Sequence, residues 1–367
     1  RTENKKDIET VFKERKDEIL GDEARFAKDD DKVRMGVETE YFVLNKDFSV
    51  INSGERMNRI LESVEEAKKE LGVDSVEIAT EPIYLDSTEE IESAIRSKEE
   101  QLGSEAEKND LKILRSGTNA FRHLDELKLS DKEFFVQIND YYRRDGRKKL
   151  IGEKNKLDVG NSRSVSLISA IHTNIQASGF DDAVEKANYV YMISPYISAL
   201  SGNARFLEGK DTGLSDLRMI MWSKSHETGD KQIGSLKSYY SDIEDYMDRV
   251  GSWPFILGRR DKEISDSVSR FWKDSRIKFV EDDLVVESRI ASTQPSINED
   301  VAVHAFCIGR VLYAQHHDEK LLEVEKVNEN RETALRKGLD SILYSSEGFE
   351  KEASVLLRDE IEKAKEG

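Results

Sequence analysis

Polar side chains at a spacing of two residues interrupt three otherwise apolar segments of this 367-residue chain. The positions are Glu38 and Glu40 in MGVETEYFVLN (35–45), His172, Asn174 and Gln176 in AIHTNIQAS (170–178), and Glu287 and Arg289 in LVVESRIAS (284–292). The apolar residues around them are typical of strands, and residues two apart on a strand share one face. The pattern therefore predicts a sheet with carboxylates, an imidazole and a guanidinium gathered on one side.

Acids on such a face indicate a metal site or ion pairs, because a buried charge is costly unless it is paired. Glu38 and Glu40 would repel each other unless a cation lay between them. Carboxylate oxygens suit Mg²⁺, which in proteins is commonly shared with the phosphates of a substrate. The alternative is a solvent-facing strand edge, which the apolar residues 41–43 disfavour. Glu77, between Val76 and Ile78, is a second candidate ligand for the same ions.

His172, Glu287 and Arg289 extend the candidate site. A single strand histidine is more often a core residue, but Asn174 and Gln176 share its face and favour a role as metal ligand. Glu287 offers another carboxylate, and Arg289 offers the planar fork that binds phosphate or carboxylate. A cross-strand salt bridge between them is the alternative, and both interpretations stay open. Further candidates for binding anions are Arg205, Arg218, Arg259, Arg260 and Arg276.

Composition excludes several classes of partner. The formal net charge is −18, so the surface repels nucleic acid and anionic membranes. We find no apolar run of the roughly 20 residues that span a membrane, and no signal peptide. Cys307 is the only cysteine, which precludes an intrachain disulfide, and its apolar surroundings predict a buried structural thiol. We therefore expect a cytoplasmic protein.

Periodicity and turn residues predict helices and strands in an irregular order. The expected strands are 33–45, 73–85, 111–121 and 163–178, followed by a hairpin over 277–291 that turns at Glu281–Asp283. The expected helices are 56–71, 88–102, 131–150, 181–200, 232–250 and 296–315, with an amphipathic N-terminal helix over 1–30 and charged C-terminal helices over 320–367. Ser296 and Glu299 have the spacing of a capping box.

These elements do not repeat as parallel βαβ units, and no linker marks a domain boundary. The expected fold is α+β, with a mainly antiparallel sheet flanked by helices. We expect a single catalytic domain over residues 1–367.

The order of the polar motifs resembles glutamate–cysteine ligase family 2, the carboxylate–amine ligase branch of the glutamine synthetase superfamily. The matching motifs are GVETE (36–40), EIAT (77–80), IHTN (171–174), ALSGNARFLEGKDTGLSDLR (199–218), FWKDSR (271–276) and VVESR (285–289). The resemblance spans residues 33–315, and the 199–218 block is its most specific part. Two positions depart from the pattern of many bacterial members: Asn174 stands where they have a second histidine, and Lys273 adjoins the acid of the tryptophan motif.

The resemblance implies a curved antiparallel sheet that forms an active-site funnel for ATP and divalent metal ions, Mg²⁺ or alternatively Mn²⁺. Glu38, His172 and Glu287 would hold the ion near the terminal phosphate. Glu40 and Glu77 would hold the ion nearer the amino-acid substrate.

Other matched residues would contact the nucleotide and the substrate. Arg289 would contact the transferring phosphate, and His172 and Asn174 would lie on the nucleotide side. Arg218 and Arg276 match family arginines that contact nucleotide or substrate.

The implied reaction joins the γ-carboxylate of L-glutamate to the amine of L-cysteine through a γ-glutamyl phosphate, with ATP as phosphate donor. A loop over residues 201–218 would shield that acyl phosphate from water. Expected partners are these small molecules, without nucleic acid or membrane, and a homodimer is left open. Two alternatives remain: the same chemistry with a different amine, and a non-catalytic relative that binds nucleotide or amino acid.

Overall fold

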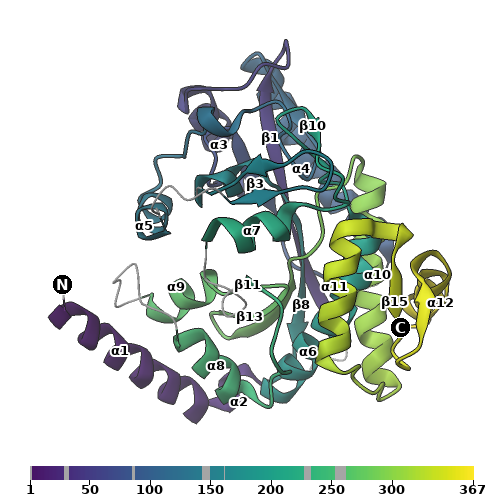
Figure 1. Ribbon diagram of the computed structural model, residues 1–367. Helices are drawn as coiled ribbons and strands as arrows, with labels where there is room; N and C mark the ends of the chain where they lie inside the picture. Colours follow the sequence, from purple (N-terminus) through teal and green to yellow (C-terminus); the bar gives the residue numbers. More distant parts are fainter. Residues whose placement is uncertain are drawn as a thin grey trace.

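The computed structural model describes residues 2–28, 33–84, 87–142, 149–160, 162–226, 233–252 and 262–367, apart from the side chains of 2–7 and 263. A curved sheet of eight strands lies at its centre (Figure 1). Its strands are β1 (Arg34–Asn45), β2 (Ala67–Lys69), β3 (Ser75–Ala79), β4 (Ile83–Tyr84), β5 (Leu111–Leu114), β8 (Ile171–Ala177), β13 (Ser275–Val280) and β14 (Asp283–Ser288). The order is β13–β14–β8–β1–β3–β2, with β4 and β5 each paired to another part of β1, and every pair is antiparallel.

Alternation along β1 separates a core face from a polar face. Met35, Val37 and Tyr41 are buried in apolar clusters, whereas Glu38 and Glu40 are only partly buried and point to the opposite face. Because side chains alternate along a strand, the same period of two that places aliphatic residues in the core also places the acids together.

Helices cover the core face of the sheet. The helix α6 (Phe180–Ser201) is buried along almost its whole length and packs with α10 (Ile297–His316) against β8, β13 and β14. The outer layer consists of α11 (Val324–Lys337) and α12 (Ala353–Glu366), at the right of Figure 1. Near β1, β3 and β5, α3 (Glu55–Ser63) and α4 (Thr88–Lys108) complete a separate apolar cluster.

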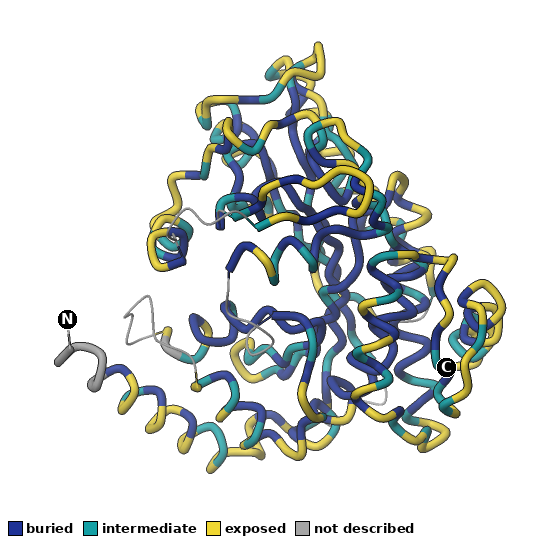
Figure 2. The backbone as a smooth tube through the Cα atoms, viewed as in Figure 1, coloured by how far each residue is buried: buried dark blue, intermediate teal, exposed yellow. Residues whose placement is uncertain are grey.

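Shorter elements surround the polar face. They are η2 (Ser162–Leu167), α5 (Glu133–Tyr142), α7 (Arg218–His226), α9 (Glu263–Ser269), β11 (Ile233–Gly234) and β12 (Trp272–Lys273). The remaining elements are α1 (Thr2–Gly21), α2 (Glu23–Phe26), η1 (Leu124–Glu126), β6 (Leu150–Ile151), β7 (Leu157–Asp158), β9 (Phe206–Leu207), β10 (Lys210–Asp211), α8 (Ile243–Gly251), η4 (Gly338–Asp340), β15 (Ile342–Tyr344) and β16 (Glu350–Glu352). Figure 2 shows that buried residues concentrate in the sheet and in α6 and α10 behind it, while α1 and the outer helices expose one side.

Several predictions about the elements are confirmed. The hairpin over 277–291 is present as β13 and β14, and α6 covers the predicted helix over 181–200. Ser296 caps α10, because its Oγ accepts a hydrogen bond from the Glu299 backbone N at 3.3 Å. The antiparallel sheet with flanking helices confirms the predicted α+β class.

Three of the predicted strands are too long. The segment 163–178 begins as η2 and joins the sheet only at Ile171, and the segment 111–121 leaves it after Leu114. These two outer parts pair with each other instead, through an isolated bridge between Thr118 and Ile168. The predicted strand 73–85 divides into β3 and β4, and its last residue lies outside the described residues.

Two predicted helices are interrupted. In the segment 56–71, α3 ends at Ser63, and Glu66 takes a positive φ of 66° that turns the chain into β2. The C-terminal region 320–367 is not entirely helical, because β15 and β16 form a hairpin between α11 and α12. Gly338 ends α11 with a φ of 56°, and a Cβ there would lie 2.4 Å from Ser215 Oγ, so glycine fits this turn.

The other differences concern helix boundaries. The N-terminal helix divides into α1 and α2, and only α8 remains of the helix predicted over 232–250, where β11 occupies the beginning. Of the helix predicted over 131–150, α5 is present. Arg143, Arg144, Arg147, Lys148, Arg259 and Arg260 lie outside the described residues. Within the described ranges, no helix is both long and apolar enough to cross a membrane.

Candidate active site

The register of the sheet brings the predicted acids and the histidine together on the polar face. Glu38 on β1 lies opposite His172 on β8. Glu40, two residues further along β1, lies opposite Glu77 on β3. Glu287 comes from β14, which pairs with β8 on its other side. Four strands thus supply five potential ligands to one surface.

These side chains form two groups that share the imidazole. Ligand atoms of Glu38, His172 and Glu287 lie within 4.8 Å of one another, and so do those of Glu40, Glu77 and His172. The Nδ1 atom of His172 is 2.8 Å from Glu38 Oε2 and 4.0 Å from Glu287 Oε1, and its Nε2 atom is 3.8 Å from Glu40 Oε1. The imidazole therefore lies between the two groups.

The donor set fits a hard divalent cation. Four carboxylates offer oxygen ligands, which Mg²⁺ and Mn²⁺ prefer, and a neutral imidazole is compatible with the same ions. Burial, and next the positive charge of Arg289, lower the pKa of His172, which favours that neutral form. The five residues predicted from the sequence are close enough to bind metal, and their role as ligands stays a prediction.

The first group, Glu38 and Glu287, is surrounded by basic side chains. Lys278 on β13 places its Nζ 3.0 Å from Glu38 Oε1 and 3.1 Å from Glu287 Oε1. Arg289 Nη1 lies 2.7 Å from Glu287 Oε2, and Arg276 pairs with the same carboxylate. Burial alone would raise the pKa of both acids, but these cations bring the pKa of Glu38 and of Glu287 well below the usual range. The ionised form of both carboxylates is therefore favoured.

The second group has an excess of acid. Burial, and then the neighbouring charge of Glu77, raise the pKa of Glu40 to about 7. Burial, Glu38 and Glu70 raise the pKa of Glu77 to about 8, and burial with Glu40 raises that of Glu70 to about 8. Lys68 lowers the pKa of Glu77 and Lys132 lowers that of Glu70, but burial and the neighbouring acids outweigh both lysines.

The predicted arginines are held by the protein. The backbone N of Arg289 donates to the Asp274 carbonyl at 2.9 Å. Arg218 donates through Nη1 to the Ile290 carbonyl at 2.9 Å, and its buried Nε has no partner in the described part of the chain. Arg276 donates to the carbonyls of Val268 and Ser269 in or next to α9. Fixed guanidinium groups at the rim of the acid cluster suit recognition of phosphate or carboxylate.

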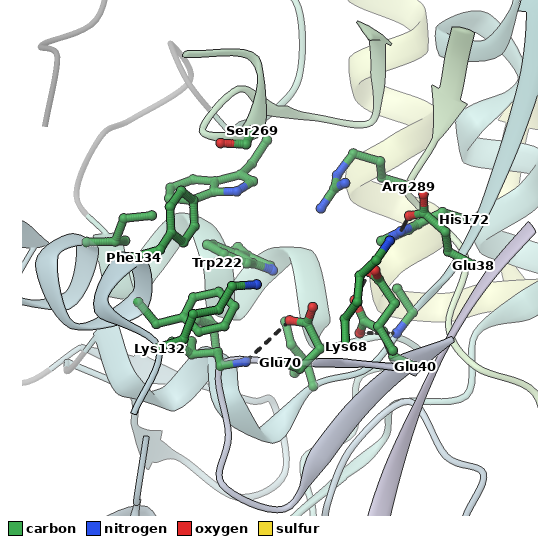
Figure 3. A pocket seen from close by; sticks show the side chains of 18 of the residues that line it. Glu38, Glu40, Lys68, Glu70, Lys132, Phe134, His172, Trp222, Ser269 and Arg289 are labelled. Atoms are coloured by element: carbon green, nitrogen blue, oxygen red, sulfur yellow. Dashed lines mark hydrogen bonds and ion pairs between the residues drawn. The ribbon is translucent and has the colours of Figure 1, made fainter. Parts of the chain in front are cut away.

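Two cavities meet at Glu38. The larger, about 690 Å³, is lined by the second carboxylate group, the three arginines and a set of aromatic side chains. Figure 3 shows Glu38, Glu40, His172 and Arg289 on one side of it, with Trp222 and Phe134 facing them across the hollow. The smaller, about 220 Å³, is lined by Gly36, Asn174 and Lys278 among others. The Oδ1 atom of Asn174 is buried there without a partner among the described residues.

Comparison with known proteins identifies the family. The model of glutamate-cysteine ligase family 2 matches residues 34–365. The chain belongs to this family. Two relatives provisionally named glutamate–cysteine ligase 2 are 25% identical over 304 residues (Solibacter usitatus) and 23% identical over 339 residues (Chloroflexus aurantiacus). These matches cover 81% and 89% of the chain, and 69% and 78% of the relatives.

Solved structures share the family fold. The glutamate–cysteine ligase of Francisella tularensis in complex with AMP aligns with a TM-score of 0.58 at 16% identity, over 92% of this chain and 79% of that one. A bifunctional glutathione synthetase from Pasteurella multocida aligns with a TM-score of 0.55 at 12% identity, over 96% and 46%. These alignments confirm the curved antiparallel sheet that the family resemblance implied.

The predicted covering loop finds no support in its position. In this family member, residues 201–218 include the β9–β10 hairpin, and Leu207, Leu214 and Leu217 are buried in an apolar cluster. Of the segment, only Arg218 lines the larger cavity. The segment thus contributes packing and one arginine.

Sequence reasoning missed several residues of the site. Lys278 lies two residues after Arg276 on β13, so the spacing of two would have found it. Glu70 follows β2 in a segment that was predicted as helix. Trp222 lies in α7, and the matched family motif ends at Arg218, the first residue of that helix. Cys307, predicted as a buried structural thiol, is buried, which confirms that prediction.

Proposed function

We propose that this protein is an ATP-dependent carboxylate–amine ligase that activates the γ-carboxylate of L-glutamate as an acyl phosphate and joins it to an amine. The observation that carries the proposal is the pair of ligand groups sharing His172, with Arg289 beside them, in a member of glutamate-cysteine ligase family 2. The family name makes L-cysteine the first amine to test.

The geometry supports a division of roles within the cluster. Glu38, His172 and Glu287 would hold the cation nearest the terminal phosphate of ATP, and Glu40 and Glu77 the cation nearest glutamate. When bound, such cations neutralise phosphate charge and align the reacting oxygens. Because the carboxylates project from adjacent strands of one sheet, their spacing is fixed before any substrate arrives.

The protein's own cations would support phosphoryl transfer. The backbone N–H of Arg289 is held by the Asp274 carbonyl and its guanidinium by Glu287, so its fork is positioned to contact the transferring phosphate. Asp274 is itself fixed, because its carboxylate pairs with the buried Arg331. Arg218 and Arg276, held by backbone carbonyls, would orient the anionic groups of substrate or nucleotide.

The smaller cavity would receive part of the nucleotide. Gly36 and Asn174 lie opposite each other on β1 and β8, one step beyond the Glu38–His172 pair. Gly36 has no side chain, and the buried Oδ1 of Asn174 has no partner among the described residues, so this position offers both space and an acceptor for an amino or hydroxyl group.

Hydroxylamine trapping tests the proposal directly. Purified protein is incubated with ATP, Mg²⁺, L-glutamate and hydroxylamine, which intercepts γ-glutamyl phosphate as the hydroxamate without help from an amine site. We expect glutamate-dependent hydroxamate and equimolar ADP. Absence of both, with Mg²⁺ or Mn²⁺ and at low or high KCl, would contradict the proposal.

A non-catalytic relative is the second candidate from the sequence. It would bind ATP or glutamate with no turnover, so calorimetric binding without hydroxamate would favour it. The complete ligand set argues against this candidate, because a protein that only binds has no need for five metal-binding side chains around one imidazole.

A further inference from the structure

In the proposed function, the end of the larger cavity that lies away from the carboxylates has no role in binding glutamate or the phosphates of ATP. Opposite the carboxylates, the cavity is lined by Phe134 and Phe135 of α5, Trp222 of α7 and Trp272 of β12. We call these four residues the aromatic wall. They come from three separate segments, yet all line the same cavity as Glu40 and Glu77.

The aromatic wall is more than core packing. Trp222 packs in tilted ring contacts against Trp272 at 4.6 Å and His226 at 4.7 Å between centroids, and these two rings also contact each other, so they support the indole from one side. Trp222, Phe134 and Phe135 nevertheless stay only partly buried, and Figure 3 shows Trp222 and Phe134 open to the cavity. Aromatic rings that are buttressed from behind and exposed in front are typical of ligand pockets.

The cavity is also large enough to hold a bulky acceptor. A volume of about 690 Å³ lies within the range of pockets that bury drug-sized ligands. Cysteine adds only one methylene and a thiol beyond its amino-acid core, so it would leave the faces of the aromatic wall in water. An acceptor with a ring would cover them, and burying that apolar area favours binding.

Polar groups lie where the amine would have to pass. Glu70 and Lys132 line the cavity between the aromatic wall and the carboxylates, and Lys132 points toward Glu70 in Figure 3. The face of Trp222 can attract a substrate ammonium through its π system. The wall can therefore hold an apolar body while the nitrogen is directed to the acyl phosphate.

We propose that the aromatic wall receives the amine substrate, and that this substrate is a primary amine carrying an aromatic or similarly large apolar group. The inference rests on the proposed ligase function and specifies its acceptor. In the transfer step, the lone pair of the neutral amine forms the C–N bond at the γ-carbonyl carbon, and the C–O bond to phosphate breaks. Phosphate leaves with that electron pair, and the protons released by nitrogen pass to water in the open cavity.

Stacking of adenine is the competing occupant of the wall. The smaller cavity at Gly36 and Asn174 lies on the other side of Glu38 and is available to the nucleotide. One ATP molecule with its terminal phosphate near Glu38 extends in one direction only. A nucleotide that occupies the smaller cavity leaves the opposite direction, toward Trp222, for the acceptor.

The test compares acceptors after hydroxamate formation has been established. ADP release is measured with ATP, Mg²⁺ and L-glutamate plus 2-phenylethylamine, tryptamine, ethylamine or L-cysteine, and mass spectrometry identifies the γ-glutamyl amides. We expect kcat/KM for the aromatic amines to exceed that for ethylamine and L-cysteine at least tenfold. Equal or better use of L-cysteine or ethylamine would overturn the inference while leaving the ligase intact.

Variants of the wall separate the amine from the nucleotide. In Trp222→Ala, the rise in the KM for 2-phenylethylamine should be at least ten times larger than any rise in the KM for ATP. Phe134→Ala, in a different helix, should act in the same direction. Phe349→Ala removes a ring that is 67% exposed and serves as the matched control. A selective rise in the KM for ATP would show adenine on the wall and overturn the inference. If no hydroxamate forms at all, the ligase proposal fails and this inference fails with it.

Discussion

The two ligand groups around His172 share a histidine and a sheet face but differ in electrostatics. Glu38 and Glu287 lie among Lys278, Arg276 and Arg289, and their pKa values are lowered. Glu40 and Glu77 lie beside Glu70 instead, and their pKa values are raised toward neutrality. Among the described residues, basic side chains thus outweigh burial at Glu38 and Glu287, whereas burial and neighbouring acids outweigh the basic side chains at Glu40 and Glu77.

This difference indicates that the two groups depend on metal in different ways. The Glu38–Glu287 side is a closed ion-pair network that is stable by itself, so a metal ion there has to compete with Lys278. The Glu40–Glu77 side carries repulsion that a divalent cation would relieve. Removing an acid from the Glu38–Glu287 group should therefore destabilise the folded protein, whereas removing one from the Glu40–Glu77 group should stabilise it.

The largest expected effect comes from Glu287→Gln. The substitution removes the shared partner of three cations, and breaking a buried ion pair in this way costs about 3–5 kcal/mol. We expect hydroxamate synthesis to fall to background and the free energy of unfolding to drop by that amount. Glu281→Gln, an exposed acid in the turn of the same hairpin, is the control for both measurements. Near-wild-type turnover in Glu287→Gln would remove the residue from the active site.

Arg289→Lys should separate activity from stability on the same side. A lysine keeps a positive charge near Glu287 but loses the planar fork, so it cannot replace two-point contact with a phosphate. We expect a loss of roughly 10²- to 10³-fold in kcat for hydroxamate synthesis, with a change in Tm of only a few degrees. Arg59→Lys, in an exposed pair with Glu55, should leave kcat unchanged. A small loss of activity would mean that Arg289 mainly supports Glu287.

Some parts of the candidate site follow from sequence spacing within single strands. The gathering of Glu38, Glu40, His172, Glu287 and Arg289 on one face was predictable because the period of a strand relates sequence spacing directly to a face. That relation needs no knowledge of the partner strand. The antiparallel register then brings the faces together.

The parts that could not be predicted depend on contacts between distant segments. The aromatic wall joins α5, α7 and β12, and no local period marks the rings as neighbours. Glu70 and β2 were read as helix, since their lysines and glutamates have helical propensity, whereas pairing with β3 decides the outcome. The charge difference between the ligand groups likewise requires the positions of Lys278 and Glu70 in space.

Lys278→Met should change the affinity for metal more than it changes the stability of the folded protein. The ammonium group lies within 3.1 Å of carboxylates from both Glu38 and Glu287, so its removal leaves two acids that a cation can bridge. We expect Mn²⁺ affinity, measured by calorimetry, to rise about tenfold, equivalent to about 1.4 kcal/mol. Lys112→Met, exposed on β5 of the same sheet, should bind Mn²⁺ as the wild type does. Weaker Mn²⁺ binding would mean that Lys278 helps to shape the metal site.

The smallest expected effect is a gain of stability in Glu77→Gln, measured in chelator. The pKa of Glu77 rises from 4.5 to about 8 on folding, so between these values the folded protein holds a proton that the unfolded chain has released. Stability contributed by that proton is present below about pH 4.5 and is lost as the pH rises through about 8. The wild-type Tm in chelator should therefore fall between pH 5 and 9.

In Glu77→Gln this fall should be shallower, and at pH 8 the variant should be more stable by an amount on the order of 1 kcal/mol. Mn²⁺ should offset the fall in the wild type, because the ion binds the deprotonated acids, and should do so less in the variant. Glu81→Gln, an exposed acid near the end of the same strand, should follow the wild-type curve. If Glu77→Gln instead lowers the Tm in chelator, the Glu40–Glu77 side is already compensated, and the asymmetry between the two ligand groups does not exist.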